Sequence, residues 1–316
     1  MDDAMRKFNI RDISNTLSSG KFRQKPQSFY AVAKHFPGGF VSRLHIHDFP
    51  QLWYCIEGNY LHRTASGIHS CSQGSLILIP PGSPDGFQVP GGEGVLLAEI
   101  DLSPTLFLKV PPERYLQTLS HLFLPNYPGG LGYSFQNQAL LDKESQQAIL
   151  EMIRTLSARS VSPVKVPADD VLSPIEDFFS LPQFRLPDSC AEEALSLLET
   201  KVIPILRAIS FIGENYDRKI TVEELTRVSA LCQTNFFRYF KILTGTSFST
   251  YLQQLRVSYV TFLIGNTDYS FSYISQLCGF NDPAHMTNAF TRCTGRPPRV
   301  GRPKLQVYYK HQKPDK

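Results

Sequence analysis

Several features of membrane and secreted proteins are missing from this sequence. Its 316 residues contain no apolar run long enough to span a membrane. The first ten residues, MDDAMRKFNI, lack the apolar core of a signal peptide. The six cysteines form no CxxC pair and stand inside apolar runs, which is typical of small buried thiols in a reducing compartment. We therefore predict a cytoplasmic protein with no membrane partner.

Acidic residues are scarce in the C-terminal third. Residues 201–316 contain 16 Lys and Arg but only 7 Asp and Glu, whereas residues 1–200 contain 16 and 21. The net charge is therefore +9 over residues 201–316 and −5 over residues 1–200. A basic part beside an acidic remainder indicates that only the basic part meets a polyanion such as nucleic acid. Chance clustering of charge is the alternative.

The rest of the composition is that of an ordinary globular chain, and its length favours two domains. Residues 1–27 are polar and partly basic, and we expect them to form an arm. From residue 28 to 102, short apolar runs alternate with Gly- and Pro-rich breaks, which predicts antiparallel strands in a sandwich or barrel. The runs are SFYAVAKHF, FVSRLHIH, QLWYCIEG, NYLHRT, IHSCS, SLILIPPG, GFQV and GVLLAEIDL.

Two segments of this region carry glycines and polar residues in a characteristic order. The first contains Gly39, His45-Ile46-His47, Gln51 and Gly58, and the second contains Gly74, Pro80-Pro81-Gly82 and Asp85. This order resembles the paired motifs of the cupin family and implies a cupin-like β barrel. Metal-binding cupins have a Glu and a closing His at the positions that are Gln51 and Asp85 here. Because Gln is a poor ligand for a transition metal, His45, His47 and Asp85 would make at best a three-ligand site.

The barrel segment leaves three functional alternatives open: a metal site, a site for a small molecule, and a barrel that binds no ligand and only dimerises. Strand alternation would place His45 and His47 on one face, with Arg43 below them. The side chains of Gln51 and Trp53 would come from the next strand. With a metal bound, this set would suit oxygenase or isomerase chemistry. Our prediction is instead a barrel without metal or other cofactor, whose polar interior binds a small-molecule effector. The predicted effector-binding residues are Arg43, His45, His47, Gln51, Trp53 and Asp85.

The middle of the chain is predicted to be mostly helical and to contain the boundary between the domains. Residues 103–135 read as an irregular connection with a short helix near 113–122. The spacing of apolar residues predicts a helix over 142–159, packed on the barrel or on a second subunit. The segment Ser162–Pro187 holds five prolines and several acids, so we expect no regular element there and place the linker at 161–200. A further helix begins near Ser189.

The C-terminal part contains one apolar pattern twice. Four positions recur after fifty residues: Phe236, Phe240, Leu243 and Gly245 correspond to Met286, Phe290, Cys293 and Gly295. Two more recur after forty-nine: Leu225 and Val228 correspond to Ile274 and Leu277. Within each copy the spacing is helical. The pattern therefore predicts a duplicated helical unit.

Each copy is predicted to be a helix-turn-helix. In the first, Thr221 and Glu224 indicate a capping box, and a second helix follows over Gln233–Leu243. A longer helix over Phe248–Ile264, with a continuous apolar stripe, separates the copies. In the second copy a helix begins at the N-cap Ser270 with Phe271, Ile274 and Leu277 buried, and the next helix runs over Pro283–Arg292. The exposed face of each second helix is the one that can enter a major groove.

The segments RYFKILTG, YLQQLRVSYVTFLI, FSYISQLCGFNDPAHMTNAF and GRPPRVGR resemble the AraC/XylS family of bacterial transcription regulators. The resemblance covers roughly residues 203–302. It implies two helix-turn-helix units on a connecting helix, with both recognition helices in adjacent major grooves of double-stranded DNA. It also implies a cupin-like sensor and dimerisation domain in front. The predicted class is α+β, with an arm at 1–27, a barrel domain at 28–160, a linker at 161–200, a DNA-binding domain at 201–302 and a basic tail at 303–316.

The resemblance also assigns DNA-contacting positions. By position, the base contacts are Gln233, Thr234, Phe237 and Arg238 in the first copy and Pro283, Ala284, His285 and Asn288 in the second. Asn235, Lys241 and Arg292 complete the predicted DNA-binding set. Phe237 either contacts a thymine methyl group or packs against Tyr251. Because Arg offers a fork of donors to guanine and Asn suits adenine, we expect the first copy to carry more of the base specificity.

The sequence departs from the family at several places. Ala230 and Cys232 stand where the first unit usually has Gly and Ser, Asn288 replaces an Arg, and Gly301 replaces an aromatic residue. The basic tail is expected to add phosphate contacts, although Gly301-Arg302-Pro303 also resembles the core of an AT-hook.

These observations predict a DNA-binding transcription activator and not an enzyme. We expect a homodimer that acts with RNA polymerase and responds to a sugar or another metabolite bound in the barrel. The alternative is a cupin metalloenzyme, an oxygenase or isomerase, fused to a DNA-binding domain.

Overall fold

The computed structural model describes residues 28–42, 45–64, 67–124, 138–162 and 164–298. The predicted arm at 1–27 and the basic tail at 303–316 lie outside these residues. The strands are β1 (Phe29–Phe36), β2 (Gln51–Glu57), β3 (Asn59–Thr64), β4 (Gly67–Ser72), β5 (Ser75–Ile79), β6 (Asp85–Gln88), β7 (Val95–Leu102) and β8 (Gln138–Leu140).

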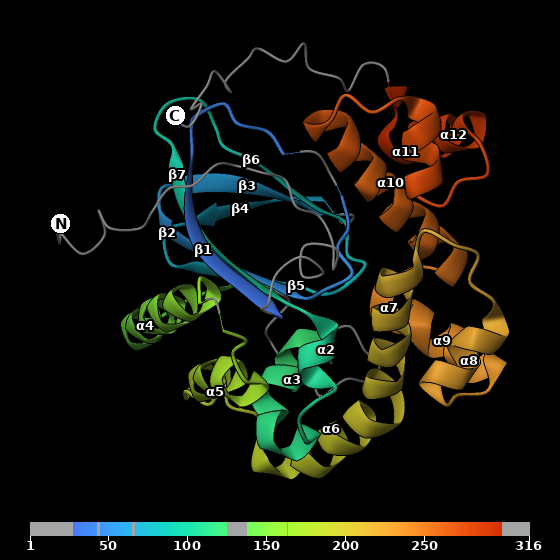
Figure 1. Ribbon diagram of the computed structural model, residues 1–316. Coiled ribbons are helices and arrows are strands. Elements are labelled where there is room, and N and C mark those ends of the chain that lie inside the picture. The colour runs from blue at the N-terminus through green and yellow to red at the C-terminus, as the bar shows by residue number, and fades with distance from the viewer. Residues whose placement is uncertain (1–27, 43–44, 65–66, 125–137, 163, 299–316) are drawn as a thin grey trace, which may run out of the picture.

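The helices fall into two groups along the chain (Figure 1). Those of the N-terminal half and the junction are α2 (Pro104–Phe107), α3 (Leu116–Phe123), α4 (Lys143–Ser160), α5 (Ala168–Phe179) and α6 (Ala191–Leu197). Those of the C-terminal half are α7 (Ile203–Asn215), α8 (Val222–Ser229), α9 (Gln233–Thr244), α10 (Phe248–Asn266), α11 (Phe271–Leu277) and α12 (Pro283–Thr294). None of these described helices combines the length and the apolar character that a membrane crossing requires.

The strands form two antiparallel sheets, as predicted for an α+β chain with a β-rich N-terminal domain. The larger sheet has the order β1-β7-β2-β5-β8 and the smaller one the order β4-β3-β6. Their facing sides share an apolar core that includes Trp53, Tyr60 and Phe87, one residue from each of three strands. The run FVSRLHIH is not a strand, contrary to our prediction. Among its described residues, 40–42 and 45–47, the β-type pairings are the isolated bridges Val41–Gln88 and His45–Asp85.

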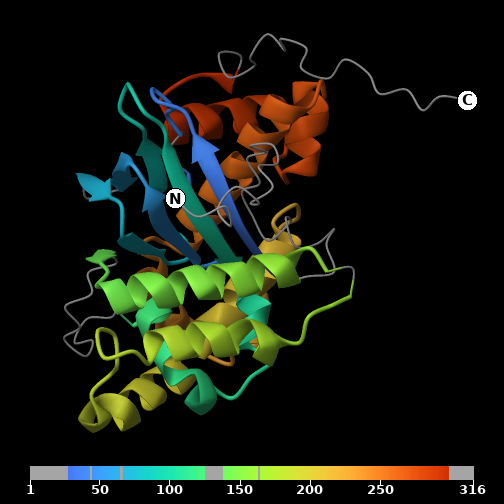
Figure 2. The same cartoon turned by 90° about the vertical axis from the view of Figure 1, so that its left-hand side faces the viewer.

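Helices cover the outer side of the larger sheet (Figures 1 and 2). Helix α4 follows the N-cap Asp142 and buries Ile149, Ile153 and Leu156. Its C-terminal residue, Ser160, donates a hydrogen bond to the carbonyl of Ala31 in β1 at 3.2 Å. The sequence left open whether this apolar stripe packs on the barrel or on a second subunit. The stripe packs on the β1 sheet of the same chain.

Helix α5 lies where we expected no regular element, so that expectation is wrong. The helix carries Pro174 in its interior. A proline cannot donate to the carbonyl four residues earlier, which is that of Asp170. The Arg159 guanidinium donates a hydrogen bond to that same carbonyl. With this acceptor satisfied, burial of Val171 and Phe179 in the core stabilises the helix despite its proline.

The N-terminal and C-terminal halves share one hydrophobic core. Helix α6 continues through a π-helical turn, η4 (Leu198–Val202), directly into α7. The widened turn ends two residues before Pro204, whose missing N–H interrupts the regular helical ladder. Leu198, Ile205 and Ile209 are buried in the same cluster as residues of the larger sheet and of α9.

Two helix-turn-helix units pack on α10, and most of the positions that the predicted repeat pairs are buried in them. Helix α10 packs its first half, including Tyr251 and Leu255, into the core of the first unit. Its second half turns a different face, with Val260 and Ile264, into a separate core of the second unit. The predicted single stripe along α10 is therefore wrong, because the helix serves two units that lie on different sides of it (Figure 1).

Candidate DNA interface and barrel site

The first helix-turn-helix is fixed by local hydrogen bonds that the sequence indicated. The Thr221 hydroxyl accepts from the N–H of Glu224 at 3.2 Å, and the Glu224 carboxylate accepts from the N–H of Thr221 at 2.8 Å. This capping box starts α8. The helix ends at Ala230, whose φ of 54° is the left-handed conformation that the family usually fills with glycine.

Helix α9 buries one face and exposes the other. Phe236 and Phe240 have no exposed surface, and Leu243 is almost fully buried, as predicted. Of the predicted DNA-contacting residues of α9, all but the half-buried Asn235 are exposed: Gln233, Thr234, Phe237, Arg238 and Lys241. The Phe237 side chain is 38% exposed, so it does not take the predicted alternative of burial against Tyr251. An exposed aromatic ring among polar side chains suits contact with a thymine methyl group.

The guanidinium of Arg238 is held on the surface of its own helix. Its Nη2 donates to Asn235 Oδ1 at 3.0 Å and to the hydroxyl of Tyr239 at 2.8 Å. The same group lies over the Tyr239 ring, 4.7 Å from its centroid. These contacts orient a fork of donors that can bind the two acceptors of a guanine edge.

The second unit repeats this arrangement with different side chains on its exposed face. The Asp282 carboxylate accepts from the N–H of His285 at 2.7 Å and so caps α12 at Pro283. Four of the five predicted contact residues of α12 are exposed and Pro283 is half-buried; the exposed ones are Ala284, His285, Asn288 and Arg292. The His285 ring packs edge-on against Phe280 at 5.4 Å. The structure thus brings the predicted residues of both units to helix surfaces.

Two expectations about burial in this half are wrong. Leu277 is 36% exposed, because α11 ends there and the following Cys278 takes the buried position. The cysteines are not all buried either. Cys232, the N-cap residue of α9, and Cys293, in the last turn of α12, are exposed. The remaining thiols include the buried Cys55 and Cys71 of the barrel.

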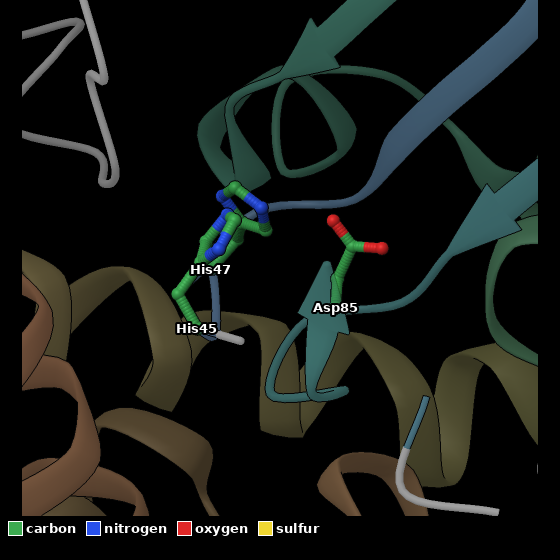
Figure 3. A group of neighbouring side chains, drawn as sticks. All are labelled: His45, His47 and Asp85. Carbon is green, nitrogen blue, oxygen red and sulfur yellow. The ribbon is translucent and has the colours of Figure 1, made fainter. Parts of the chain in front are cut away.

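The barrel cluster of His45, His47 and Asp85 is formed as a compact group. One ligand atom from each side chain lies within 4.8 Å of the others. In Figure 3 the two imidazoles lie beside each other and the carboxylate of Asp85 faces them. Their ring centroids are 4.6 Å apart. His47 and Asp85 are buried and His45 is half-buried, whereas Arg43 lies outside the described residues.

Sequence reasoning missed His62, which is a partner of this cluster. Its Nε2 lies 2.6 Å from Asp85 Oδ1, and both side chains are buried. Burial would raise the pKa of Asp85, but the hydrogen bond from His62 and the nearby histidine charges outweigh it, so the pKa lies below its usual range. Strand alternation in NYLHRT places His62 on the same side as Tyr60, which was the available signal.

Gln51 faces carboxylates that were also missed. Its Nε2 donates to Asp101 Oδ1 at 2.6 Å and to Glu99 Oε1 at 3.1 Å. Lys34 Nζ donates to Glu99 Oε2 at 2.5 Å. These charges alternate with apolar residues in the run GVLLAEIDL, so the alternation could have located them. The nearby Trp53 is 6% exposed and packs against Phe87 in the aromatic core between the two sheets.

Two family models match this chain. A model described as an AraC-like ligand binding domain matches residues 26–166, and one described as a helix-turn-helix domain matches residues 225–303. The two segments correspond to the two-sheet half with its α4 helix and to the two helix-turn-helix units. Together they cover more than two thirds of the sequence.

Several known regulators are similar to the chain. The HTH-type transcriptional activator RhaR of Escherichia coli is 22% identical over 286 residues, which cover 89% of this chain and 94% of that protein. The probable transcriptional regulator LumQ of Photobacterium leiognathi is 29% identical over 110 residues, 34% of this chain and 44% of that protein. The lactose operon transcription activator of Staphylococcus xylosus is 31% identical over 88 residues, 28% of this chain and 32% of that protein. The chain thus spans less than half the length of the last two.

A solved structure shares the two-domain fold. The structure of ToxT from Vibrio cholerae aligns with 86% of this chain and 97% of its own, with a TM-score of 0.52 and 11% sequence identity. At this identity the likeness concerns the fold alone. Both family models and the two-domain fold agree with the two helix-turn-helix units and the β-rich domain in front of them. The chain belongs to the AraC family of transcription regulators.

Proposed function

We propose that this protein is a one-component transcription regulator that binds double-stranded DNA with α9 and α12 in adjacent major grooves. One observation carries this proposal. Two helix-turn-helix units with exposed polar faces are held on the single rigid helix α10. The guanidinium of Arg256 fixes that helix by donating to the carbonyls of Tyr216 at 2.7 Å and Arg218 at 2.8 Å. The spacing of the two recognition helices is therefore set by the fold.

Charge supports the assignment of the DNA-binding part. The net charge of +9 over residues 201–316 favours the approach of phosphate groups, whereas residues 1–200 carry −5. Within the interface, Arg238 supplies a bidentate donor and Asn288 suits an adenine edge. The first unit then contributes most of the discrimination among bases, and Lys241 and Arg292 contribute phosphate contacts.

The β-rich half is proposed to bind a small-molecule effector. Its interior combines aromatic surface around Trp53 with a polar group that includes Gln51 and Asp85. The Trp53 Nε1 and the Gln51 Oε1 are buried without a hydrogen-bond partner among the described residues. A buried polar atom without a partner is costly, so a ligand with both donors and acceptors would stabilise this interior. A sugar or another polar metabolite has such groups.

Regulation follows from a difference in contacts between the liganded and free states. An effector that binds one arrangement of the two halves more tightly shifts the population toward it. We propose activation as the outcome, since relatives similar to this chain are named transcription activators. The protein would then act in the cytoplasm as a homodimer together with RNA polymerase, and not as an enzyme.

The test is to sequence the genomic DNA that the full-length protein retains. Fragmented DNA from the source organism is incubated with the purified chain, and the bound fraction is recovered after washing at two salt concentrations. We expect a small set of fragments that share two half-sites about one helical turn apart. Recovery of fragments without a shared motif, in proportion to their abundance, would contradict sequence-specific recognition. The genes beside the recovered sites would indicate the pathway and the class of effector.

A further inference from the structure

The side chains of His45, His47 and Asp85 offer the donor set that divalent transition metals prefer. Two imidazole nitrogens and one carboxylate oxygen lie within 4.8 Å of one another. Bonds of about 2.1 Å to a shared ion bring neighbouring ligand atoms to roughly 3 Å, which small side-chain rotations would achieve here. We propose that this cluster binds one divalent transition-metal ion and that the ion regulates the DNA-binding half. The regulatory part rests on the function proposed above.

The backbone holds the three ligand-bearing residues in place. The N–H of His45 donates to the carbonyl of Asp85 at 2.9 Å, and the N–H of Asp85 donates back to His45 at 2.8 Å. The carbonyl of His47 accepts from the N–H of Gly82 at 2.7 Å. The two segments that carry the ligands are therefore joined by three hydrogen bonds. A site whose ligands are already positioned loses little conformational entropy when an ion binds.

The two carboxylate oxygens of Asp85 differ in their hydrogen bonding. Asp85 Oδ1 is bonded to His62, the kind of outer partner that orients a metal-binding carboxylate. Asp85 Oδ2 is buried and has no hydrogen-bond partner among the described residues. A buried carboxylate oxygen without a partner is unfavourable, and a cation between the imidazoles would satisfy it.

The donor chemistry selects the class of ion. Two histidines and one carboxylate suit Zn²⁺, Ni²⁺, Fe²⁺ or Mn²⁺, whereas Ca²⁺ and Mg²⁺ prefer sets made of oxygen atoms alone. Gln51, which occupies the place of a fourth ligand in metal-binding cupins, donates its amide to Asp101 and Glu99 instead. The ion would thus have three protein ligands and open positions. Because His45 is half-exposed, the ion can exchange with solvent, as a regulatory ion must.

The same segments touch the DNA-binding half. Gly82, bonded to His47, lies against Tyr251 of α10 and Thr244 at the end of α9, since a Cβ built at position 82 would be 2.8 Å and 3.0 Å from their atoms. Coordination by His47 and Asp85, on either side of this turn, would restrain its position against Tyr251. The ion therefore favours one orientation of α9 and α10 over another, which is the condition for a regulatory ligand.

The first experiment measures metal binding by the full-length protein, purified without a histidine tag and freed of metal with a chelator. Zn²⁺, Ni²⁺, Fe²⁺ and Mn²⁺ are added one at a time, and bound ion is measured by equilibrium dialysis with elemental analysis. We expect one ion per chain, with a dissociation constant below about 10 μM for at least one metal. We expect His47→Gln and His45→Gln to weaken binding at least tenfold, and His69→Gln, on the exposed strand β4, to leave it unchanged.

His45 is only half-buried, so its variant tests the site even if the change at the buried His47 unfolds the protein. Less than half an ion per chain for every metal, or undiminished binding by the folded His45→Gln variant, would overturn the metal site.

The second experiment separates the site from its regulatory role. Affinity for a genomic fragment recovered as described above is measured by fluorescence anisotropy, with and without the ion that binds. We expect the ion to change the dissociation constant at least fivefold in the unaltered protein and not in His45→Gln. An ion that binds without changing DNA affinity would overturn the regulatory role and leave the site standing. If no sequence-specific fragment is recovered in either state, the proposed function fails, while the dialysis result still decides on the site.

Discussion

Gly82, in the turn between β5 and β6, lies directly against the ring of Tyr251 in α10. A Cβ built on Gly82 would be 2.8 Å from Tyr251 Cε2 and 3.0 Å from the Cβ of Thr244. Tyr251 has no exposed surface, and its ring packs edge-on against Phe240 of α9 at 5.2 Å. The β-rich half therefore contacts both α10 and α9 at Gly82, where the packing is too close to admit a side chain.

This contact predicts a difference between two glycine substitutions. Gly82 and Gly39 have nearly the same left-handed backbone, with φ of 79° and 82°, but only Gly82 has a neighbour where a Cβ would stand. Alanine at either position costs about 1–2 kcal/mol of unfolding free energy through its backbone. Gly82→Ala also crowds Tyr251, so we expect a further loss of about 1–3 kcal/mol. Urea denaturation of both variants measures the difference. Equal losses would show that the two halves do not make this contact in solution.

Replacing Arg238 tests base recognition by the first unit. We expect Arg238→Ala to weaken binding to a selected genomic site by about 1–3 kcal/mol and to relax preference at one base pair, because the fork of donors to a guanine is lost. Arg238→Lys keeps the charge but not the fork, so preference at that base pair should relax here too. Binding to randomised and selected DNA, measured by gel shift, reports both effects.

The matched control for charge is Arg185→Ala. Arg185 is exposed in the N-terminal half and forms an ion pair with Asp188 at 3.2 Å. Its loss should leave both affinity and base preference unchanged. If Arg238→Ala weakens all sequences equally, the residue contacts phosphate and does not read a base.

Ala230 should be replaceable by glycine with a gain in stability. Its φ of 54° makes it the only non-glycine residue with a positive φ in the part of the chain that the structure describes. The corresponding turn of the second unit contains Gly279, with φ of 71°. We expect Ala230→Gly to raise the free energy of unfolding by about 1 kcal/mol. Ala148→Gly, in the middle of α4, should lower it by a similar amount and serves as the control. Denaturant midpoints of the two variants that move in the same direction would contradict this account.

Local patterns predicted most of the DNA-binding half correctly. The repeat located Phe236, Phe240, Met286 and Phe290, all of which are buried, and short-range rules located the caps at Thr221 and Asp282. Such features depend on residues three or four positions apart, so they can be read directly from the chain. The α5 helix was missed because its stabilisation depends on contacts from elsewhere, such as the Arg159 guanidinium on the carbonyl freed by a proline.

The barrel site was predicted only in part for the same reason. His45, His47 and Asp85 were grouped correctly through a resemblance to known motifs. Strand alternation indicates the face on which His62 lies, but its pairing with Asp85 joins residues of different strands, and no local spacing identifies that partner. Leu277 shows a further limit, since the repeat predicted its burial but the end of α11 gives that position to the next residue. Which of two neighbouring residues faces the core is decided where a helix ends.

His121 gives the protein a specific sensitivity to acid. Its side chain is buried, stacks on Phe179 with ring centroids 4.7 Å apart, and has its Nε2 2.7 Å from the carbonyl of Phe184. Burial disfavours the charged imidazolium and lowers the pKa of His121 to about 4, although the hydrogen bond to Phe184 acts in the opposite direction. The unfolded chain binds this proton near pH 6.5, so below that pH proton binding stabilises the unfolded state relative to the folded one.

We therefore expect the stability that His121 contributes at neutral pH to be lost as the pH falls from about 6.5 toward 4. A shift of this size corresponds to roughly 3 kcal/mol of unfolding free energy. His121→Gln can still donate to the carbonyl of Phe184 but cannot take up a proton. Urea denaturation between pH 7.5 and 4 should show a flatter pH dependence for this variant than for the unaltered protein. His69→Gln removes an exposed histidine and should leave the profile unchanged. Parallel profiles for His121→Gln and the unaltered protein would show that another group controls acid unfolding.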